Sequence, residues 1–378
     1  LNVSFRTDGS NNFGSDEQFN PTWSAGAVWH VSEETFMEVV RPVLSRLSLR
    51  VATGYTGNIN KTVKPNLMMK YYKNFRISDD ENYRMGYINN APNPKLRWEK
   101  TRDVKVALDF GLWKDRINGI VEAYWRKSKD CVTSEYVPVT TGFFNQSYNT
   151  SVLQNNGVEF SLSVAVLKSK DYNLSVSANV AWNQNKLKKY NSPNTSLALD
   201  KYVGYPMGAV FSGKYEGIDP ETGMYKFKLR PDAVTNKDGY LREPNNYYYY
   251  LGTSVAPFTG GFNLNFSYKN IGLSVGGSYS VKAKMVDNIE SPAGYELLSG
   301  SKLESIPTPH NDLYRNHLNV KREVRNRWTP ENRTGVKYPR LIDAYGKKLG
   351  LDLTNPTLTT ITRGALLEDI SYLRINTI

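Results

Sequence analysis

The sequence has one cysteine, Cys131, three histidines and no long apolar run. A single cysteine excludes an intrachain disulfide framework, a cysteine zinc site and an iron–sulfur cluster. No window approaches the roughly 20 uninterrupted apolar residues that a membrane-spanning helix needs, which excludes an α-helical membrane protein. His310 and His317 stand seven residues apart in an expected loop, where we expect a surface pair rather than metal ligands.

Catalytic and cofactor-binding motifs are also scarce. Residues Gly272–Gly276 match the G-x-S-x-G nucleophile elbow, but they lie inside an expected strand with no helix after it. Calcium could bind the oxygens of Asp79, Asp80 and Glu81, or of Asp219 and Glu221, yet neither group has the spacing of an EF-hand. P-loop, dinucleotide-binding and zinc-binding spacings are absent. We therefore expect no enzymatic activity, no metal and no cofactor.

Positive charge is in excess, because 48 Lys and Arg face 36 Asp and Glu, giving a net charge of +12. The basic residues are scattered apart from short clusters such as Lys186–Lys189 and Lys321–Arg327, so we expect no nucleic-acid partner. Basic residues near strand ends can instead pair with anionic lipid head groups. The aromatic content of 12% is far above that of disordered chains, so we expect a folded chain.

Alternation of apolar and polar residues is the dominant pattern, and it predicts about ten strands that each have one apolar and one polar face. The alternating runs are Leu1–Phe5, Trp23–Val31, Leu47–Tyr55, Val104–Leu112, Ile117–Trp125, Val158–Val164, Leu174–Trp182, Phe262–Tyr268, Leu273–Tyr279 and Ile370–Ile375. Many apolar faces carry an aromatic residue near the strand end, which is typical of the aromatic girdles of membrane barrels. These residues are Trp23, Trp29, Tyr55, Trp98, Trp125, Trp182, Tyr268 and Tyr279.

The connections between the expected strands alternate between short and long. The short ones are 113–116, 167–172 and 269–271, and a fourth, Ser32–Arg46, is expected to hold a helical turn with Ser32 as its N-cap. The long ones are 8–20, 57–97, 127–156, 183–260 and 281–367. Short periplasmic turns and long extracellular loops are the layout of an outer-membrane antiparallel β-barrel. A water-soluble β-sandwich or propeller is the alternative.

This topology assigns the two faces of the strands. We expect Val106, Leu108, Phe110, Val121, Phe160, Leu162, Val176 and Val180 to face lipid. We expect Lys105, Asp109, Glu122, Glu159 and Asn179 to face the lumen.

The long loops are rich in aromatic residues. Aromatic rings stack on sugar rings or peptide side chains, while hydroxyls and amides supply hydrogen bonds. The candidates for contact with a ligand or a covering partner are Tyr71, Tyr72, Phe143, Phe144, Tyr248 and Tyr249. Packing of one loop on another is the alternative reading of each ring.

Several segments, in this order, resemble the SusC/RagA family of TonB-dependent outer-membrane transporters from Bacteroidetes. They include Phe5–Ser10, Trp23–Trp29, Leu49–Asn58, Asn93–Lys100, Asp109–Leu112, Asn156–Phe160, Gly217–Gly223, Arg327–Asn332, Pro339–Leu341 and Ser371–Arg374. The resemblance covers nearly the whole chain, and the combined order of the motifs is highly specific.

The resemblance implies a plugged transmembrane barrel of about 22 strands, of which residues 1–378 would form a partial barrel domain without the plug, the TonB box or the last strands. It implies import of oligosaccharides or peptides, a SusD-like surface lipoprotein as partner, and energy from the TonB complex. Two alternatives stay open. One is a ten-stranded omptin-type protease, which would need an Asp/His pair at the top of the barrel. His30 argues against this protease, because we expect this residue at the periplasmic end. The other is a soluble carbohydrate-binding β-sandwich.

Overall fold

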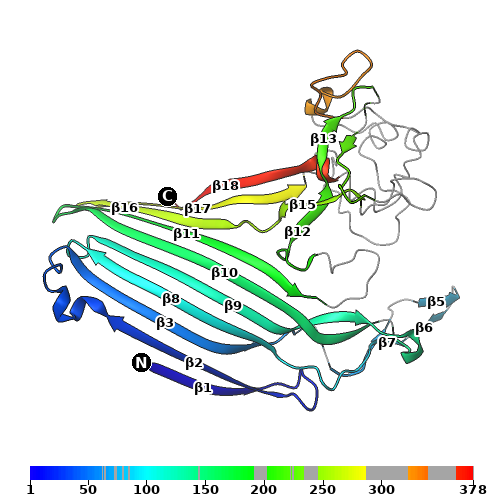
Figure 1. Ribbon diagram of the computed structural model, residues 1–378, viewed down its shortest axis with the longest axis horizontal. Helices are drawn as coiled ribbons and strands as arrows, with labels where there is room; N and C mark the ends of the chain where they lie inside the picture. Colours follow the sequence, from blue (N-terminus) through cyan, green and yellow to red (C-terminus); the bar gives the residue numbers. More distant parts are fainter. Residues whose placement is uncertain are drawn as a thin grey trace. The chain divides into compact units, whose positions relative to one another are not determined.

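Ten long strands form one sheet in the computed structural model of the chain (Figure 1). The structure describes all residues except 62, 64, 72–74, 79–80, 84–85, 144, 191–201, 222, 224, 234–245, 287–321, 339–362 and 378. The strands are β1 (Asn2–Gly9), β2 (Phe19–His30), β3 (Leu44–Asn58), β8 (Glu99–Leu112), β9 (Ile117–Tyr136), β10 (Asn145–Lys168), β11 (Tyr172–Lys189), β16 (Phe258–Tyr268), β17 (Ile271–Val286) and β18 (Leu367–Thr377). Each run of alternating residues corresponds to one of these strands, so the predicted all-β sheet is confirmed.

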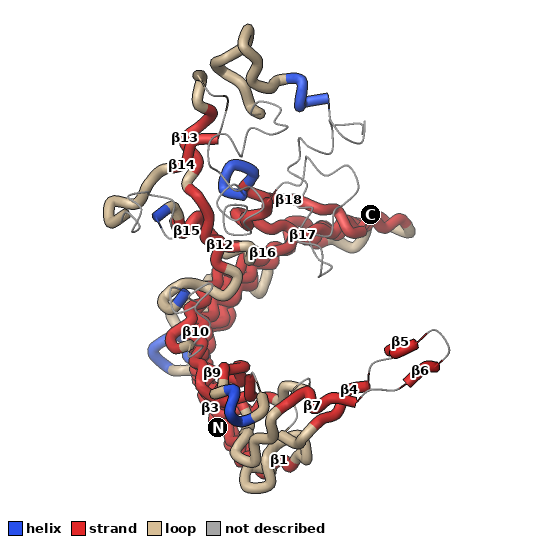
Figure 2. The backbone as a smooth tube through the Cα atoms, turned by 90° about the vertical axis from the view of Figure 1, so that its right-hand side faces the viewer, coloured by secondary structure: helices blue, strands red, loops and turns tan. Residues whose placement is uncertain are grey.

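The strand order follows the sequence, β1-β2-β3-β8-β9-β10-β11-β16-β17-β18, so β1 and β18 stand at its two edges. Neighbours pair antiparallel, as in β8 with β9 and β10 with β11. Figure 2 shows the part of the sheet that includes β1, β3, β9 and β10 as a curved surface. The chain divides into unit 1 (Leu1–Met207, Pro257–Val281, Tyr372–Ile378) and unit 2 (Gly208–Ala256, Lys282–Ser371).

Short hairpins and 3₁₀ helices lie in the connections between the ten strands. The hairpin pairs are β4 (Met68–Tyr71) with β7 (Gly86–Asn90), β5 (Phe75–Ser78) with β6 (Glu81–Tyr83), β12 (Ala209–Gly213) with β15 (Tyr248–Thr253), and β13 (Tyr215–Ile218) with β14 (Tyr225–Phe227). The 3₁₀ helices are η1 (Val31–Glu33), η2 (Thr35–Met37), η3 (Val139–Thr141), η7 (Arg322–Arg325) and η8 (Arg363–Leu366). Across the described residues, no helix has the length and apolar character to cross a membrane.

The register separates apolar and polar side chains onto opposite faces of the sheet. Leu108 lies opposite Val121, Val121 opposite Phe160, and Phe160 opposite Val180, so these residues share one face. All eight predicted lipid-facing residues lie on this apolar face, which we define as Val106, Leu108, Phe110, Val121, Phe160, Leu162, Val176 and Val180. All five predicted lumen-facing residues lie on the polar face, which carries Lys105, Asp109, Glu122, Glu159 and Asn179.

The apolar face is not covered by a second sheet in the part of unit 1 that the structure describes. Leu108 is 39% exposed and Val176 is 37% exposed, although both are apolar and lie within long strands. In a β-sandwich such residues would interdigitate with the facing sheet and be buried. The exposure of this face therefore contradicts the sandwich alternative.

The strands β9 and β10 are longer than expected, so the predicted loop over 127–156 is wrong. Pairing continues from Trp125 opposite Asn156 up to Tyr136 opposite Asn145, and only residues 137–144 connect the two strands. The extension is rich in Ser, Thr and Asn, so the apolar alternation stops while the backbone hydrogen bonds continue. The strand β11 likewise runs on to Lys189 instead of ending before Asn183.

The connection between β2 and β3 contains the expected helical turn, as η1 and η2, but the predicted N-cap is wrong. Ser32 lies inside η1, the N-cap position is His30, and His30 makes no side-chain capping bond. The reason is that β2 runs to His30 and the 3₁₀ helix begins at the next residue, so Ser32 is already one residue inside the helix.

Trp98 is the one aromatic whose assignment to the girdles is wrong. It precedes β8, is 5% exposed, and stacks on Phe13 with ring centroids 4.7 Å apart. Its indole nitrogen donates to the carbonyl of Gln18 at 3.1 Å. The other predicted girdle residues lie in the register of the apolar face: Trp23, Trp29, Tyr55, Trp125, Trp182, Tyr268 and Tyr279.

Candidate functional site

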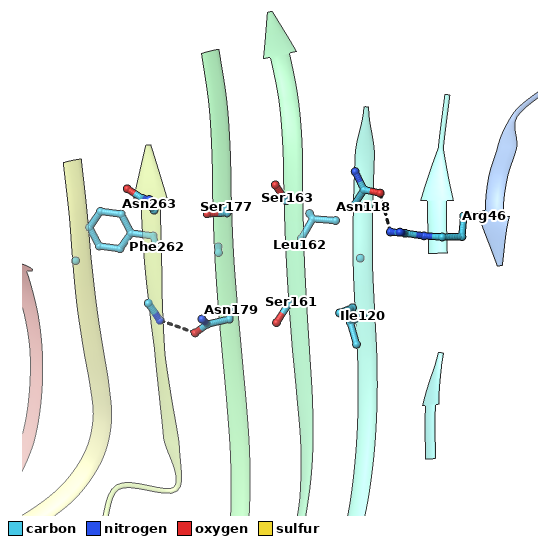
Figure 3. A pocket seen from close by; sticks show the side chains of 14 residues that line it. Arg46, Asn118, Ile120, Ser161, Leu162, Ser163, Ser177, Asn179, Phe262 and Asn263 are labelled. Carbon is cyan, nitrogen blue, oxygen red and sulfur yellow. Dashed lines mark hydrogen bonds between the residues drawn. The ribbon is translucent and has the colours of Figure 1, made fainter. Parts of the chain in front are cut away.

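Two transverse rows of residues, most of them Ser or Asn, cross the polar face of unit 1. They line a shallow concavity of about 430 Å³ to which β3, β9, β10, β11, β16 and β17 contribute (Figure 3). One row is Asn118, Ser163, Ser177 and Asn263, and the other is Ile120, Ser161, Asn179 and Gly261. Because paired residues lie side by side across the strands, the four neighbouring strands β9, β10, β11 and β16 place hydroxyls and amides on one surface.

The chemistry of this concavity is neutral hydrogen bonding. The Asn179 side-chain oxygen accepts a bond from the Gly261 backbone nitrogen at 2.8 Å, and the Arg46 guanidinium donates to the Asn118 side-chain oxygen at 2.9 Å. Arg46 is the only ionisable side chain among the lining residues. Serine hydroxyls and asparagine amides both donate and accept hydrogen bonds, which suits a neutral ligand rich in hydroxyls or amides. The lining supplies binding groups rather than a general acid or base.

Charged residues on the polar face lie toward β3, β8 and β9, and they form ion pairs between neighbouring strands. The pairs are Arg50 with Asp109 (2.6 Å), Lys105 with Glu122 (3.0 Å) and Arg126 with Asp103 (2.8 Å). Partly exposed pairs contribute little to stability. Their effect is to fix the side chains and neutralise the charges along this part of the face. The alternation predicted the face but not the pairing, which depends on strand register.

A cluster of hydrogen bonds between polar residues connects the segment before β8 to the β9–β10 hairpin. The Asn149 amide donates to the carbonyls of Arg97 and Asp130, both at 2.7 Å, and its oxygen accepts from the Arg97 backbone nitrogen at 2.9 Å. The Arg97 guanidinium pairs with Asp130 at 2.7 Å. That hydrogen bond raises the pKa of Arg97 above its ordinary value.

A small core lies at this same end of unit 1. Leu96 is 1% exposed, Phe13 packs on Trp98, and the backbone nitrogen of Gly14 donates to the Leu96 carbonyl at 2.9 Å. The Asn93 amide donates to the Ser147 carbonyl at 2.7 Å. The connection between β1 and β2 and the segment before β8 are therefore folded against one another, which favours loop packing for these residues.

Unit 2 has its own buried aromatic residues. Trp328 and Tyr338 are almost fully buried, and the Trp328 backbone nitrogen donates to the Tyr338 carbonyl at 2.9 Å. The Trp328 indole donates to the carbonyl of Pro220 at 2.9 Å, joining segments that are 108 residues apart. Tyr215, with ring contacts to β14, has its hydroxyl pKa raised by burial.

The acidic groups and histidines considered as metal ligands form no cluster in the described part of the chain, where no three His, Cys, Asp or Glu residues are placed to hold an ion. The Asp219 carboxylate instead accepts a bond from the Glu221 backbone nitrogen at 2.8 Å, which closes a local turn. Glu81 lies in β6. His310, His317, Asp79 and Asp80 lie outside the described residues.

The G-x-S-x-G match and His30 both lie on strands of the ten-stranded sheet. Residues Gly272–Gly276 lie within the strand β17, as expected. His30 ends β2 beside the short connection to β3, and its Nδ1 lies 3.0 Å from the Ser48 hydroxyl.

The candidate aromatic residues fall on separate elements. Tyr71 ends β4 opposite Gly86, and Phe143 is half-buried just after η3. Tyr248 and Tyr249 are half-buried in β15, and the Tyr249 hydroxyl donates to the Leu229 carbonyl at 2.8 Å. Tyr72 and Phe144 lie outside the described residues. The role of these six aromatics stays a prediction.

The Ser and Asn rows are the surface that sequence reasoning missed. Their signal was present in the polar positions of the alternating runs, where Ser161, Ser163, Ser177 and Asn179 stand between apolar residues. Single positions of this kind carry little information, because the rows exist only when the strands are paired in the observed register.

Comparisons with known proteins agree with this architecture. The chain is 34% identical over 205 residues to the TonB-dependent receptor SusC from Bacteroides thetaiotaomicron, which covers 52% of this chain and 20% of SusC. It is 25% identical over 400 residues to the TonB-dependent receptor P26 from Formosa agariphila, covering 99% of this chain and 36% of P26. The RagAB peptide transporter structure matches with a TM-score of 0.70 and 25% identity, over 99% of this chain and 38% of that chain.

The chain thus spans roughly a third of the length of these relatives when it is matched along its whole length. The model of the family described as TonB dependent receptor-like, beta-barrel matches residues 1–298, which is more than half of the chain. The chain therefore belongs to the TonB-dependent receptor-like β-barrel family and is located in the outer membrane.

Proposed function

We propose that this chain forms part of the barrel of an importer that carries oligosaccharides or peptides across the outer membrane. The observation that carries the proposal is the register of β8 to β16, which places Leu108, Val121 and Phe160 on one face and the Ser and Asn rows on the other. In membrane barrels the apolar face meets lipid and the polar face lines the lumen. A lumen lined by hydroxyls and amides offers many weak hydrogen bonds to a passing hydrophilic solute.

The partners follow from the same family. A SusD-like surface lipoprotein would cover the side of the long loops, and the TonB complex would supply energy through a region outside this chain. The relative named as the RagAB peptide transporter supports a peptide cargo, whereas the likeness to SusC supports the wider class of nutrient import. The family consists of transporters rather than enzymes, so the omptin-type protease is disfavoured.

We propose further that the ten strands belong to a larger closed barrel. Strands β1 and β18 stand at the two edges of the sheet, and edges left unpaired are not tolerated inside lipid. The length of the relatives supports this proposal, because whole barrels of this type have about 22 strands.

Deletion of the gene tests the transport proposal. The deletion strain is grown on oligosaccharides or on peptides as the limiting nutrient, with the intact gene restored as the control. We expect growth to fail on one of the two classes and to return with the intact gene. Co-purification of the full-length protein should also recover a surface lipoprotein. Unchanged growth and uptake on both classes would contradict the proposal.

The polar rows are tested in the full-length protein by replacing Asn179 with Trp, which projects a bulky ring into the concavity. Val180→Trp is the matched control, because it places the same ring on the apolar face one residue away. We expect the first variant to slow uptake and the second to leave uptake unchanged at equal protein levels.

A further inference from the structure

The connection between β2 and β3 displays a group of exposed apolar side chains within eight residues. Phe36 is 65% exposed, Val39 is 90% exposed and Val43 is 50% exposed, with Val40 between them also exposed. A single exposed apolar residue needs no explanation, but a contiguous group of this kind indicates an interaction surface. We call residues 36–43 the apolar turn.

The apolar turn is an ordered element. The Arg41 guanidinium donates to the carbonyls of Ser32 and Glu33, both at 2.9 Å, and closes the segment on itself. The backbone nitrogen of Leu44 donates to the Val40 carbonyl at 2.8 Å. With its backbone carbonyls bonded internally, the turn can hold its apolar side chains outward in a fixed arrangement.

The connection that holds the apolar turn meets the apolar face of the sheet. Trp29 lies in that face opposite Leu49, and its indole donates to the Glu34 carboxylate at 2.8 Å, so the start of the connection reaches the apolar side. On the neighbouring connection, the Trp113 backbone nitrogen donates to the Val43 carbonyl at 2.7 Å. Both tryptophan side chains are about half exposed.

Charge and aromatic placement around the turn match a membrane interface. Basic residues occupy the other short connections at this end of the sheet, whereas the connection that holds the turn carries Glu33, Glu34 and Glu38 beside Arg41. The basic residues are Lys114, Arg116, Lys168, Lys170 and Lys269. Tyr268 stacks on Tyr172 with centroids 6.2 Å apart, and the Lys269 ammonium lies 5.3 Å from the Tyr268 ring centroid. Tyrosine and tryptophan gather at the headgroup level of membranes, where Lys and Arg reach the phosphates.

We propose that the apolar turn is an interfacial anchor that buries Phe36, Val39, Val40 and Val43 in the periplasmic leaflet of the outer membrane. The occupant of this surface is phospholipid, because the turn joins two strands of the lipid-facing sheet and its connection bonds to both Trp29 and Trp113. Segments that display apolar side chains beside polar ones lie in the headgroup and acyl boundary in this way. The proposal rests on the outer-membrane location and is independent of the transported solute.

Photo-crosslinking in intact outer membranes tests it with the full-length protein. The photoreactive residue p-benzoylphenylalanine replaces Val39 in one variant and Phe36, which it resembles in shape, in a second. Val139 in η3 is the matched control, because it is an apolar residue 71% exposed on a 3₁₀ helix at the opposite, long-loop end. After irradiation, adducts are identified by mass spectrometry.

We expect phospholipid adducts at positions 36 and 39 and no phospholipid adduct at position 139. A protein adduct at positions 36 and 39 would overturn the proposal and identify the turn as a docking site for a periplasmic protein. Absence of any adduct at both positions, with correct assembly of the barrel, would also overturn it, since the turn would then be in water. Failure of transport would leave these outcomes unchanged, so the two proposals can fail separately.

Discussion

At the scale of single residues, neighbours in the chain have opposite surroundings. Leu108 lies on the apolar face and Asp109 on the polar face, where Asp109 pairs with Arg50 at 2.6 Å. A charge is tolerated at the second position because the face is polar and a partner is present. At the first position the same charge would be placed in lipid.

Leu108→Arg is therefore expected to destabilise the full-length barrel by roughly 2–4 kcal/mol if the residue lies near the bilayer midplane. The measurement is the free energy of unfolding in phospholipid vesicles. Ser161→Arg is the matched control, because Ser161 lies on the polar face and its variant should change stability little. Equal destabilisation by both variants would contradict the assignment of the faces.

At the scale of elements, strand pairing extends beyond the segments in which apolar and polar residues alternate. The strands β9 and β10 continue past the last apolar alternation, and Asn149 ties their hairpin to the segment before β8 through Arg97 and Asp130. This cluster holds polar residues that a sequence reading assigns to a loop.

Asn149→Ala removes three hydrogen bonds of this cluster and leaves the carbonyls of Arg97 and Asp130 without that partner. We expect a loss of about 1–3 kcal/mol, because unsatisfied backbone groups carry a desolvation cost. The measurement is amide hydrogen exchange, which should speed up in residues 93–98 and change little in β16. Asn265→Ala is the control. Asn265 lies in β16, and its side-chain oxygen accepts a hydrogen bond from the Ser274 hydroxyl in β17. Unchanged exchange at 93–98 would show that the Asn149 amide is not needed to hold this segment.

At the scale of the whole molecule, the ten-stranded sheet has two edge strands, β1 and β18. Residues 1–378 expressed alone should not form a stable monomeric barrel, because unpaired edge groups are costly in lipid. The check is electrophoretic mobility with and without heating in detergent, with the full-length protein as the control. A heat-modifiable folded monomer with ten closed strands would refute the larger barrel.

The six candidate aromatics are tested in the whole molecule, because each is a candidate for contact with a ligand or with a partner protein. Alanine at Tyr71, Tyr72, Phe143, Phe144, Tyr248 and Tyr249 in the full-length protein should weaken uptake or lipoprotein association. A true anchor should cost more than about 1 kcal/mol in binding, and a spectator almost nothing. Tyr249→Phe is the informative single variant, because it removes only the hydroxyl that bonds to the Leu229 carbonyl. If uptake and lipoprotein association both survive all six changes, the assignment of these rings is wrong.

The sequence by itself determined the ten strands, their two faces and the short connections. Alternation with a period of two is a local property, so Leu108 and Glu122 could be assigned to faces without knowing their neighbours. The family resemblance was also readable from local segments such as Leu49–Asn58.

Only the tertiary structure decided what depends on register and on distant packing. The rows that join Ser161 to Asn179 exist because β10 and β11 pair in one register, and one residue of slip would move every side chain to the other face. Trp98 reads as a girdle residue by its spacing, but Phe13, some 85 residues earlier, buries it. The Trp328 bond to Pro220 likewise joins segments whose sequences contain no sign of each other. Contacts of this kind are set by how the chain folds back on itself, which local periodicity does not encode.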